Sequence, residues 1–186
     1  MGFGCREGKE FCKGLSLPEI IRDLLEMPSE TAVADIARTY SAHYLNPNNR
    51  NMTLFPDALP CLDKLKAQGY WLAVATGKGR GGLGQRHQPN PPPAAIGSPP
   101  PARGEYPSKP SPEMVFGICG ELGLDPKEAL VVGDTAHDLH MAANAGAAAV
   151  GVTTGAHSRE QLRTAPHLAV LDGLSELPGF LAQHYA

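Results

Sequence analysis

The fold is decided by residues 129–152, which read ALVVGDTAHDLHMAANAGAAAVGV. The first four residues are apolar on both faces, which is typical of a buried parallel strand. Apolar positions from Leu139 to Ala145 then predict a helix, and residues 149–152 predict a second short strand. A strand, a helix and a strand in this order predict one unit of a parallel α/β sheet.

The same alternation continues on both sides of this stretch. Upstream, Asp57 is a candidate cap for a helix that Gly69 ends, and the apolar run of residues 70–75 predicts a further buried strand. Downstream, residues 158–161 have capping-box spacing and residues 167–171 predict a last strand. The chain therefore predicts a doubly wound parallel sheet with helices on both faces.

The regions outside this alternation are of three kinds. Residues 1–14 have no periodicity and are interpreted as a tail, and two amphipathic helices within residues 15–53 predict a small helical cap. Residues 79–107 contain eight prolines and almost no large apolar side chains, so we expect this segment to be disordered. The core is then predicted to comprise residues 54–78 and 108–186.

Composition narrows the class of protein. The net charge of −3 argues against a nucleic-acid partner, and no apolar run reaches the length of a membrane span. The four cysteines form no CxxC pair, so we expect reduced thiols and a cytoplasmic location. The opening residues are too polar for a signal peptide.

Polar residues follow the predicted strands. In open α/β sheets, ligands bind beyond the carboxyl ends of the strands. Thr76 and the amide of Gly77 can approach a phosphate there, and Lys109 can hold it as a point charge. Asp134 and Asp138 lie where a strand gives way to a helix, and two neighbouring carboxylates favour a divalent cation.

Three motifs resemble those of the haloacid-dehalogenase-like (HAD) superfamily, and most closely its phosphoglycolate-phosphatase-like branch. They are Thr76 after an apolar strand, Lys109 before a proline, and GDTAHD at residues 133–138. The similarity runs over residues 54–78 and 108–180. The resemblance implies a phosphoric monoester hydrolase that acts on a small phosphorylated metabolite with Mg²⁺.

The resemblance also implies a role for each candidate residue. Thr76 would bind phosphate, and Lys109 would bridge phosphate and nucleophile. Asp134 would bind Mg²⁺, and Asp138 would support the metal site or bind the metal through water. The helices of residues 15–45 resemble the family's inserted cap.

One motif of the family is absent. Its nucleophile and general acid form a D-x-D motif at the end of the first strand, yet residues 1–14 contain no aspartate. The family's first strand lies at the centre of the sheet, between those that end at Thr76 and Asp134. Burial of its five or six apolar residues would contribute roughly 10 kcal/mol to the free energy of unfolding, which is about the whole stability of a typical domain. We therefore expect an inactive chain that folds poorly or pairs the flanking strands differently.

Other interpretations remain. One alternative is that the chain is a non-catalytic remnant or a phosphate-binding regulatory module. A further hypothesis is that residues 79–107 are translated out of frame and that the true start of the protein lies upstream of Met1. A phosphoacceptor receiver domain also uses Thr, Lys and carboxylates in a doubly wound sheet. In such domains the acidic residues precede the lysine in the chain, whereas here they follow it. His137 and His140 raise the alternative of a transition-metal site, although solvated helix positions explain them.

Overall fold

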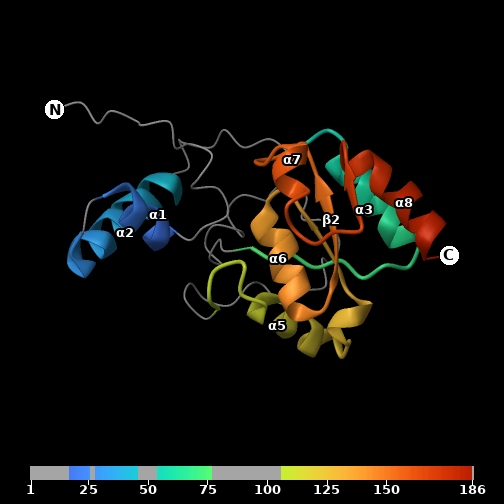
Figure 1. Cartoon of the computed structure of the whole chain (residues 1–186), viewed down its shortest axis with the longest axis horizontal. Coiled ribbons are helices and arrows are strands. Elements are labelled where there is room, and N and C mark those ends of the chain that lie inside the picture. The colour runs from blue at the N-terminus through green and yellow to red at the C-terminus, as the bar shows by residue number, and fades with distance from the viewer. Residues whose placement is uncertain (1–16, 26–27, 46–53, 77–105, 186) are drawn as a thin grey trace.

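The sheet has three parallel strands in a computed structural model that describes residues 17–25, 28–45, 54–76 and 106–185 (Figure 1). They are β1 (Leu130–Gly133), β2 (Ala148–Val152) and β3 (Ala169–Leu171), hydrogen-bonded in the order β1-β2-β3. The predicted α/β class is confirmed, because helices cover both faces of this sheet.

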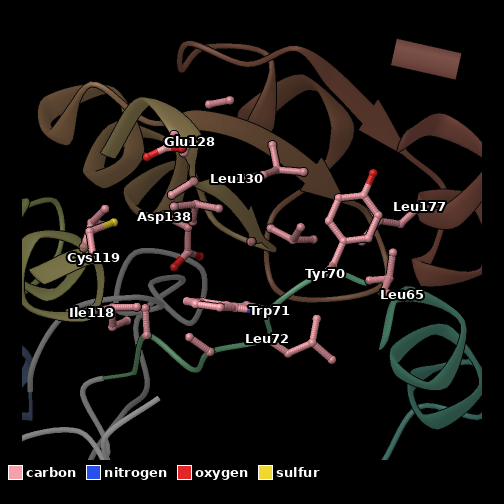
Figure 2. Close-up of a pocket in the computed structure, with 18 of the residues that line it drawn as sticks. Leu65, Tyr70, Trp71, Leu72, Ile118, Cys119, Glu128, Leu130, Asp138 and Leu177 are labelled. Carbon is pink, nitrogen blue, oxygen red and sulfur yellow. The ribbon is translucent and has the colours of Figure 1, made fainter. Parts of the chain in front are cut away.

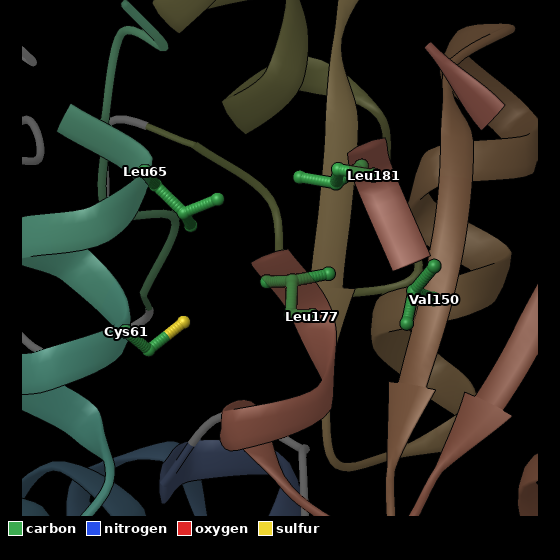
Figure 3. Packing of buried hydrophobic residues seen from close by; sticks show 5 residues of the cluster. All are labelled: Cys61, Leu65, Val150, Leu177 and Leu181. Atoms are coloured by element: carbon green, nitrogen blue, oxygen red, sulfur yellow. The ribbon is translucent and has the colours of Figure 1, made fainter. Parts of the chain in front are cut away.

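One face of the sheet is covered by α3 (Ala58–Ala67), the short η3 (Leu174–Glu176) and α8 (Leu177–His184). Figure 3 shows Cys61 and Leu65 of α3 and Leu177 of α8 gathered towards Val150 of β2. Val150 is fully buried. This layer therefore fixes β2 from one side.

The other face is covered by α5 (Glu113–Leu122), α6 (Ala136–Ala145) and α7 (Arg159–Leu162). Leu139 of α6 and Leu162 of α7 are fully buried, with Ala149 of β2 in the same cluster. Because successive strand residues point to opposite faces, Ala149 and Val150 contribute to different layers.

The ends of several helices follow the local signals in the sequence. Gly123 ends α5 and Gly146 ends α6 at left-handed φ values of 69° and 76°, which glycine adopts without a steric penalty. Capping boxes begin η2 (Pro126–Glu128), α6 and α7, with Asp125, Thr135 and Ser158 as the capping residues.

The predicted capping role of Asp57 is wrong. Asp57 occupies the residue before α3, but its side chain makes no capping hydrogen bond there. Its Oδ2 instead accepts the amide of Ser175, 3.0 Å away in η3. The carboxylate therefore links the start of α3 to η3 rather than capping the first turn of its own helix.

The two amino-terminal helices, α1 (Leu17–Leu24) and α2 (Glu30–Leu45), pack as a pair beside the layered core (Figure 1). The pair buries Ile21 and Val33, whereas Ile36 and Tyr40 of α2 are exposed although the helix was predicted to be amphipathic. Two helices alone cover only part of each other's surface, which explains this difference. No helix in the described ranges is long and apolar enough to cross a membrane.

The predicted strand at residues 70–75 does not form. This segment has no regular secondary structure and pairs with none of the described strands. Trp71 and Val74, expected to be buried, are 59% and 48% exposed. A strand needs a hydrogen-bonded neighbour, and no described residue occupies the position between residues 70–76 and β1. Of the two expected outcomes, a different pairing of the flanking strands is not seen among the described residues.

Two cysteines lie in the described part of the chain. Cys61 and Cys119 are buried and form no disulfide bond with each other. Burial raises the pKa of both thiols, because the charged thiolate is disfavoured in apolar surroundings. Such buried cysteines are inert packing residues. Cys5 and Cys12 lie outside the described residues.

Candidate functional site

The candidate site lies at one end of a cavity of about 940 Å³ between residues 70–76 and β1. Figure 2 shows Trp71 and Leu72 on one side of this cavity, with Leu130 and Asp138 on the other. The four described site candidates, Thr76, Lys109, Asp134 and Asp138, all line it. The fifth, Gly77, lies outside the described residues, as does nearly all of residues 79–107.

Lys109 joins the two sides of the cavity. Its Nζ donates to the carbonyl oxygen of Ala75 at 3.0 Å and to Asp138 Oδ1 at 2.6 Å. The side chains of Lys109 and Asp138 are only 16% and 9% exposed. One ammonium group thus connects the segment that ends at Thr76 with the start of α6, although 34 and 29 residues separate it from its two partners.

Asp138 is also a structural residue of α6. Its Oδ2 accepts the amide of Thr135 at 3.1 Å and the Thr135 hydroxyl at 2.6 Å, completing the capping box. A carboxylate in the first turn also interacts favourably with the helix dipole. Both oxygens of Asp138 are therefore engaged, one by Lys109 and one by Thr135. This geometry favours Asp138 as the partner of Lys109 over direct contact with a metal.

Asp134 is held by the loop that follows β2. Its Oδ2 accepts the amide of Ala156 at 2.9 Å, and its backbone carbonyl accepts the amide of His157 at 3.0 Å. A methyl group at Gly155 would overlap the Asp134 side chain, so the loop comes this close only because residue 155 is glycine. Sequence reasoning missed this loop, and the one signal for it was Gly155 itself.

Replacing Gly155 with alanine is therefore expected to displace Asp134 and to lower the free energy of unfolding by about 1–3 kcal/mol. Urea denaturation measures this change. Gly120→Ala on α5 is the matched control, because nothing lies near an added methyl group there. The control should raise stability by roughly 0.5 kcal/mol, since alanine is the better helix former. Equal stability of the two variants would contradict the close approach.

Histidines surround the start of α6. His157 Nδ1 accepts the amide of Ala136 at 3.0 Å, and its ring centroid lies 6.1 Å from that of His137. Desolvation lowers the pKa of His137, and the neighbouring His157 lowers it further. Within the described part of the chain, no three His, Cys, Asp or Glu side chains gather as a metal site. The alternative of a transition-metal site at His137 and His140 therefore has no support from the geometry.

Comparisons with known proteins agree with the fold and the motifs. The family model described as HAD-hydrolase-like matches residues 107–177. Probable phosphatase IndB of Dickeya dadantii is 35% identical over 179 residues, which cover 89% of this chain and 74% of that protein. A phosphoglycolate phosphatase of Haemophilus influenzae is 34% identical over 134 residues, covering 68% of this chain and 57% of that protein.

A solved structure is similar as well. The haloacid dehalogenase-like hydrolase from Bacteroides fragilis superimposes with a TM-score of 0.78 at 26% identity, covering 90% of this chain and 80% of that one. The fold, the motifs and the relatives together place this protein in the class of phosphoric monoester hydrolases built on a parallel α/β sheet. The chain belongs to the HAD-like hydrolases, and within them it is similar to the phosphoglycolate phosphatases.

Proposed function

We propose that this chain is a HAD-type phosphatase by descent, with a site for a small phosphomonoester and Mg²⁺. In the form given by its sequence, the chain does not hydrolyse that ester. The observation that carries this proposal is the position of Lys109, whose Nζ bonds to Ala75 and Asp138 at once. Those two bonds bring the segment ending at Thr76 and the GDTAHD motif to a single place beside one cation.

The phosphate-binding part of the proposal rests on Thr76 and Lys109. Both line the same end of the cavity, where a hydroxyl donor and an ammonium group suit a phosphoryl group. Asp138 forms an ion pair with Lys109 and keeps the ammonium group in position. The amide of Gly77 remains a predicted third donor.

The donor set fits Mg²⁺. This ion is usually bound by one or two carboxylates, with water and substrate phosphate completing its octahedral shell. Asp134 supplies a half-buried carboxylate at the cavity, and Asp138 lies behind it to orient the site or to bind through water. When bound, Mg²⁺ would neutralise phosphate charge. The Ala156 amide holds the Asp134 carboxylate that would bind this ion.

A nucleophile is missing from the described lining. Besides Asp134 and Asp138, the acidic side chain that lines the cavity is Glu128. Its Oε2 accepts the amide of Asp125 at 2.8 Å and so completes the capping box of η2. Apart from Asp134 and Asp138, no described carboxylate that lines the cavity is therefore placed to attack a phosphoryl group beside Lys109.

The purified chain is expected to show no Mg²⁺-dependent hydrolysis of a generic aryl phosphate above the buffer rate. Release of the aryl alcohol measures this directly, with an intact relative assayed in parallel as the positive control. Asp134→Asn should leave the null result unchanged. Robust turnover by the parent chain that Asp134→Asn abolishes would reveal a nucleophile elsewhere and overturn the inactive assignment.

A non-catalytic phosphate-binding module is the second candidate function. It is favoured by the ion pair of Lys109 and Asp138, which is largely buried although the described lining of the cavity offers no nucleophile. In this case, inorganic phosphate with Mg²⁺ should raise the melting temperature, since a ligand that binds the folded state stabilises it. The names of the relatives make phosphoglycolate the first ester to test in either case.

A further inference from the structure

The loop of residues 153–158, between β2 and α7, sets the orientation of the Asp134 carboxylate. The Ala156 amide donates to Asp134 Oδ2 at 2.9 Å, and the His157 amide donates to the backbone carbonyl of Asp134 at 3.0 Å. Glycine at residue 155 allows this close approach, because an added methyl group would overlap the same carboxylate. Since a hydrogen bond is directional, the rotation of the carboxylate follows the position of the loop.

The side chain of His157 attaches this loop to α6. Its Nδ1 accepts the amide of Ala136, the first residue of α6, at 3.0 Å, and the contact is partly buried. The first amides of a helix have no partner within the helix and need an acceptor from outside it. The capping box serves the amides of Thr135 and Asp138 but not that of Ala136. His157 therefore supplies an acceptor that the capping box does not.

The start of α6 is a firm support for the loop. Thr135 and Asp138 are only 4% and 6% exposed, and Asp138 is held by Lys109 as well as by the capping box. The bond from His157 to Ala136 thus ties the loop to a fixed part of the core. Through the neighbouring Ala156 amide, that position is passed on to Asp134 Oδ2.

We propose that His157 is a positioning residue for the Asp134 carboxylate and thereby determines how tightly the site holds Mg²⁺. The imidazole acts through the loop and does not bind the ion itself. Metal-binding carboxylates depend on their hydrogen-bond partners, and loss of such a partner typically weakens metal affinity about 10–100-fold. The inference rests on the proposed function, which places Mg²⁺ at Asp134, and it adds to that site a residue outside the GDTAHD motif.

Binding of Mn²⁺, a substitute for Mg²⁺ at oxygen ligands, tests this proposal on the whole chain. Electron paramagnetic resonance measures the free ion, and added Mg²⁺ should displace the bound fraction. At about pH 8, above the usual titration range of histidine, His157→Ala should weaken binding about tenfold or more. His157→Asn should stay within about threefold of the parent, because the asparagine Oδ1 replaces Nδ1 as the acceptor for the Ala136 amide.

Two controls locate the ion and separate positioning from stability. Asp134→Asn should abolish the binding that Mg²⁺ displaces. His140→Ala removes a histidine of α6 that takes no part in the capping box or in the hydrogen bond to the Asp134 carboxylate, so it should leave the affinity unchanged. A purely structural role would lower the melting temperature of His157→Ala by about 2–4 °C without changing its Mn²⁺ affinity.

The parent protein offers two measurements that do not depend on the folding of His157→Ala. Nδ1 of a neutral imidazole accepts a hydrogen bond only when the ring carries its proton on Nε2. Nitrogen NMR of histidine-labelled protein should therefore show an unprotonated Nδ1 for His157, assigned by its loss in His157→Asn. Pulsed resonance spectra of bound Mn²⁺ should show no nitrogen coupling, because the imidazole is not a ligand.

Equal Mn²⁺ affinity of the parent and His157→Ala would overturn the positioning role alone. Equal weakening in His157→Ala and His157→Asn would do the same, as would a protonated Nδ1 in the parent. Nitrogen coupling would make His157 a ligand of the ion and so replace the proposal. A parent chain that binds no Mn²⁺ would overturn the proposed Mg²⁺ site together with the role of His157, which distinguishes the two failures.

Discussion

A fusion that places an apolar strand ending in D-x-D ahead of residue 15 is expected to become both more stable and catalytically active. The strand would replace residues 1–14 and reach the groove between residues 70–76 and β1 by an added flexible linker. The expected change in turnover is from the buffer rate to a measurable Mg²⁺-dependent rate on an aryl phosphate. This is the largest functional effect that we expect for the chain.

The expected gain in stability follows from burial in the groove. Five apolar side chains buried between the two helical layers contribute roughly 10 kcal/mol as an upper estimate. Ordering the same residues costs about 1.5 kcal/mol each. The net gain in the free energy of unfolding is therefore a few kcal/mol, which urea denaturation can measure. Trp71 should become less exposed in the same variant.

A matched fusion separates folding from chemistry. The same strand with both aspartates changed to asparagine keeps the apolar residues that fill the groove. It should recover most of the stability gain, and it should show no turnover because it lacks the nucleophile. Turnover by the asparagine fusion would contradict the assignment of chemistry to D-x-D. If neither fusion gained stability, the groove would not accept a strand at all.

Asp138→Ala is expected to cost about 3–5 kcal/mol of unfolding free energy. The substitution leaves the ammonium group of Lys109, only 16% exposed, without its carboxylate partner. Breaking a buried ion pair from one side costs about this much, because the remaining charge stays desolvated. It also removes the acceptor for the amide and the hydroxyl of Thr135 at the start of α6. Thermal and urea denaturation, combined with circular dichroism, measure the loss.

Gln161→Ala is the matched control for Asp138→Ala. Gln161 occupies the equivalent position in the capping box of α7, where its side chain accepts the amide of Ser158 at 2.8 Å. It has no ion-pair partner, so we expect a loss of about 1 kcal/mol or less. Similar losses for the two variants would show that the cap, rather than the pair with Lys109, determines the importance of Asp138. The double variant Lys109→Met, Asp138→Ala should recover part of the loss, because it removes the unpaired charge.

The sequence predicted those features that depend on neighbours along the chain. Gly69 follows the end of α3 at a φ of 88°, as predicted, because only a few neighbouring residues decide a left-handed helix end. The capping box of α7 lies where its spacing predicted, for the same reason. The local sequence pattern gave a wrong prediction at Asp57. Its carboxylate accepts the amide of Ser175, far away in the chain, instead of capping α3.

Much of the candidate site could also be predicted. Thr76, Lys109, Asp134 and Asp138 line one cavity, as expected for residues beyond the carboxyl ends of parallel strands. The partners within the site could not be predicted. Which oxygen of Asp138 meets Lys109, and which amide holds Asp134, depends on the distances between elements far apart in sequence.

By itself, the sequence determined the α/β class, the helix ends and the set of residues around the site, because hydrophobic period, caps and strand-end polar residues are local properties. Tertiary structure alone decided that residues 70–75 form no strand and that a groove opens beside β1. The physical reason is that a strand exists only through hydrogen bonds to a neighbour. An apolar run predicts where a strand belongs, but only the folded chain shows whether that neighbour is present.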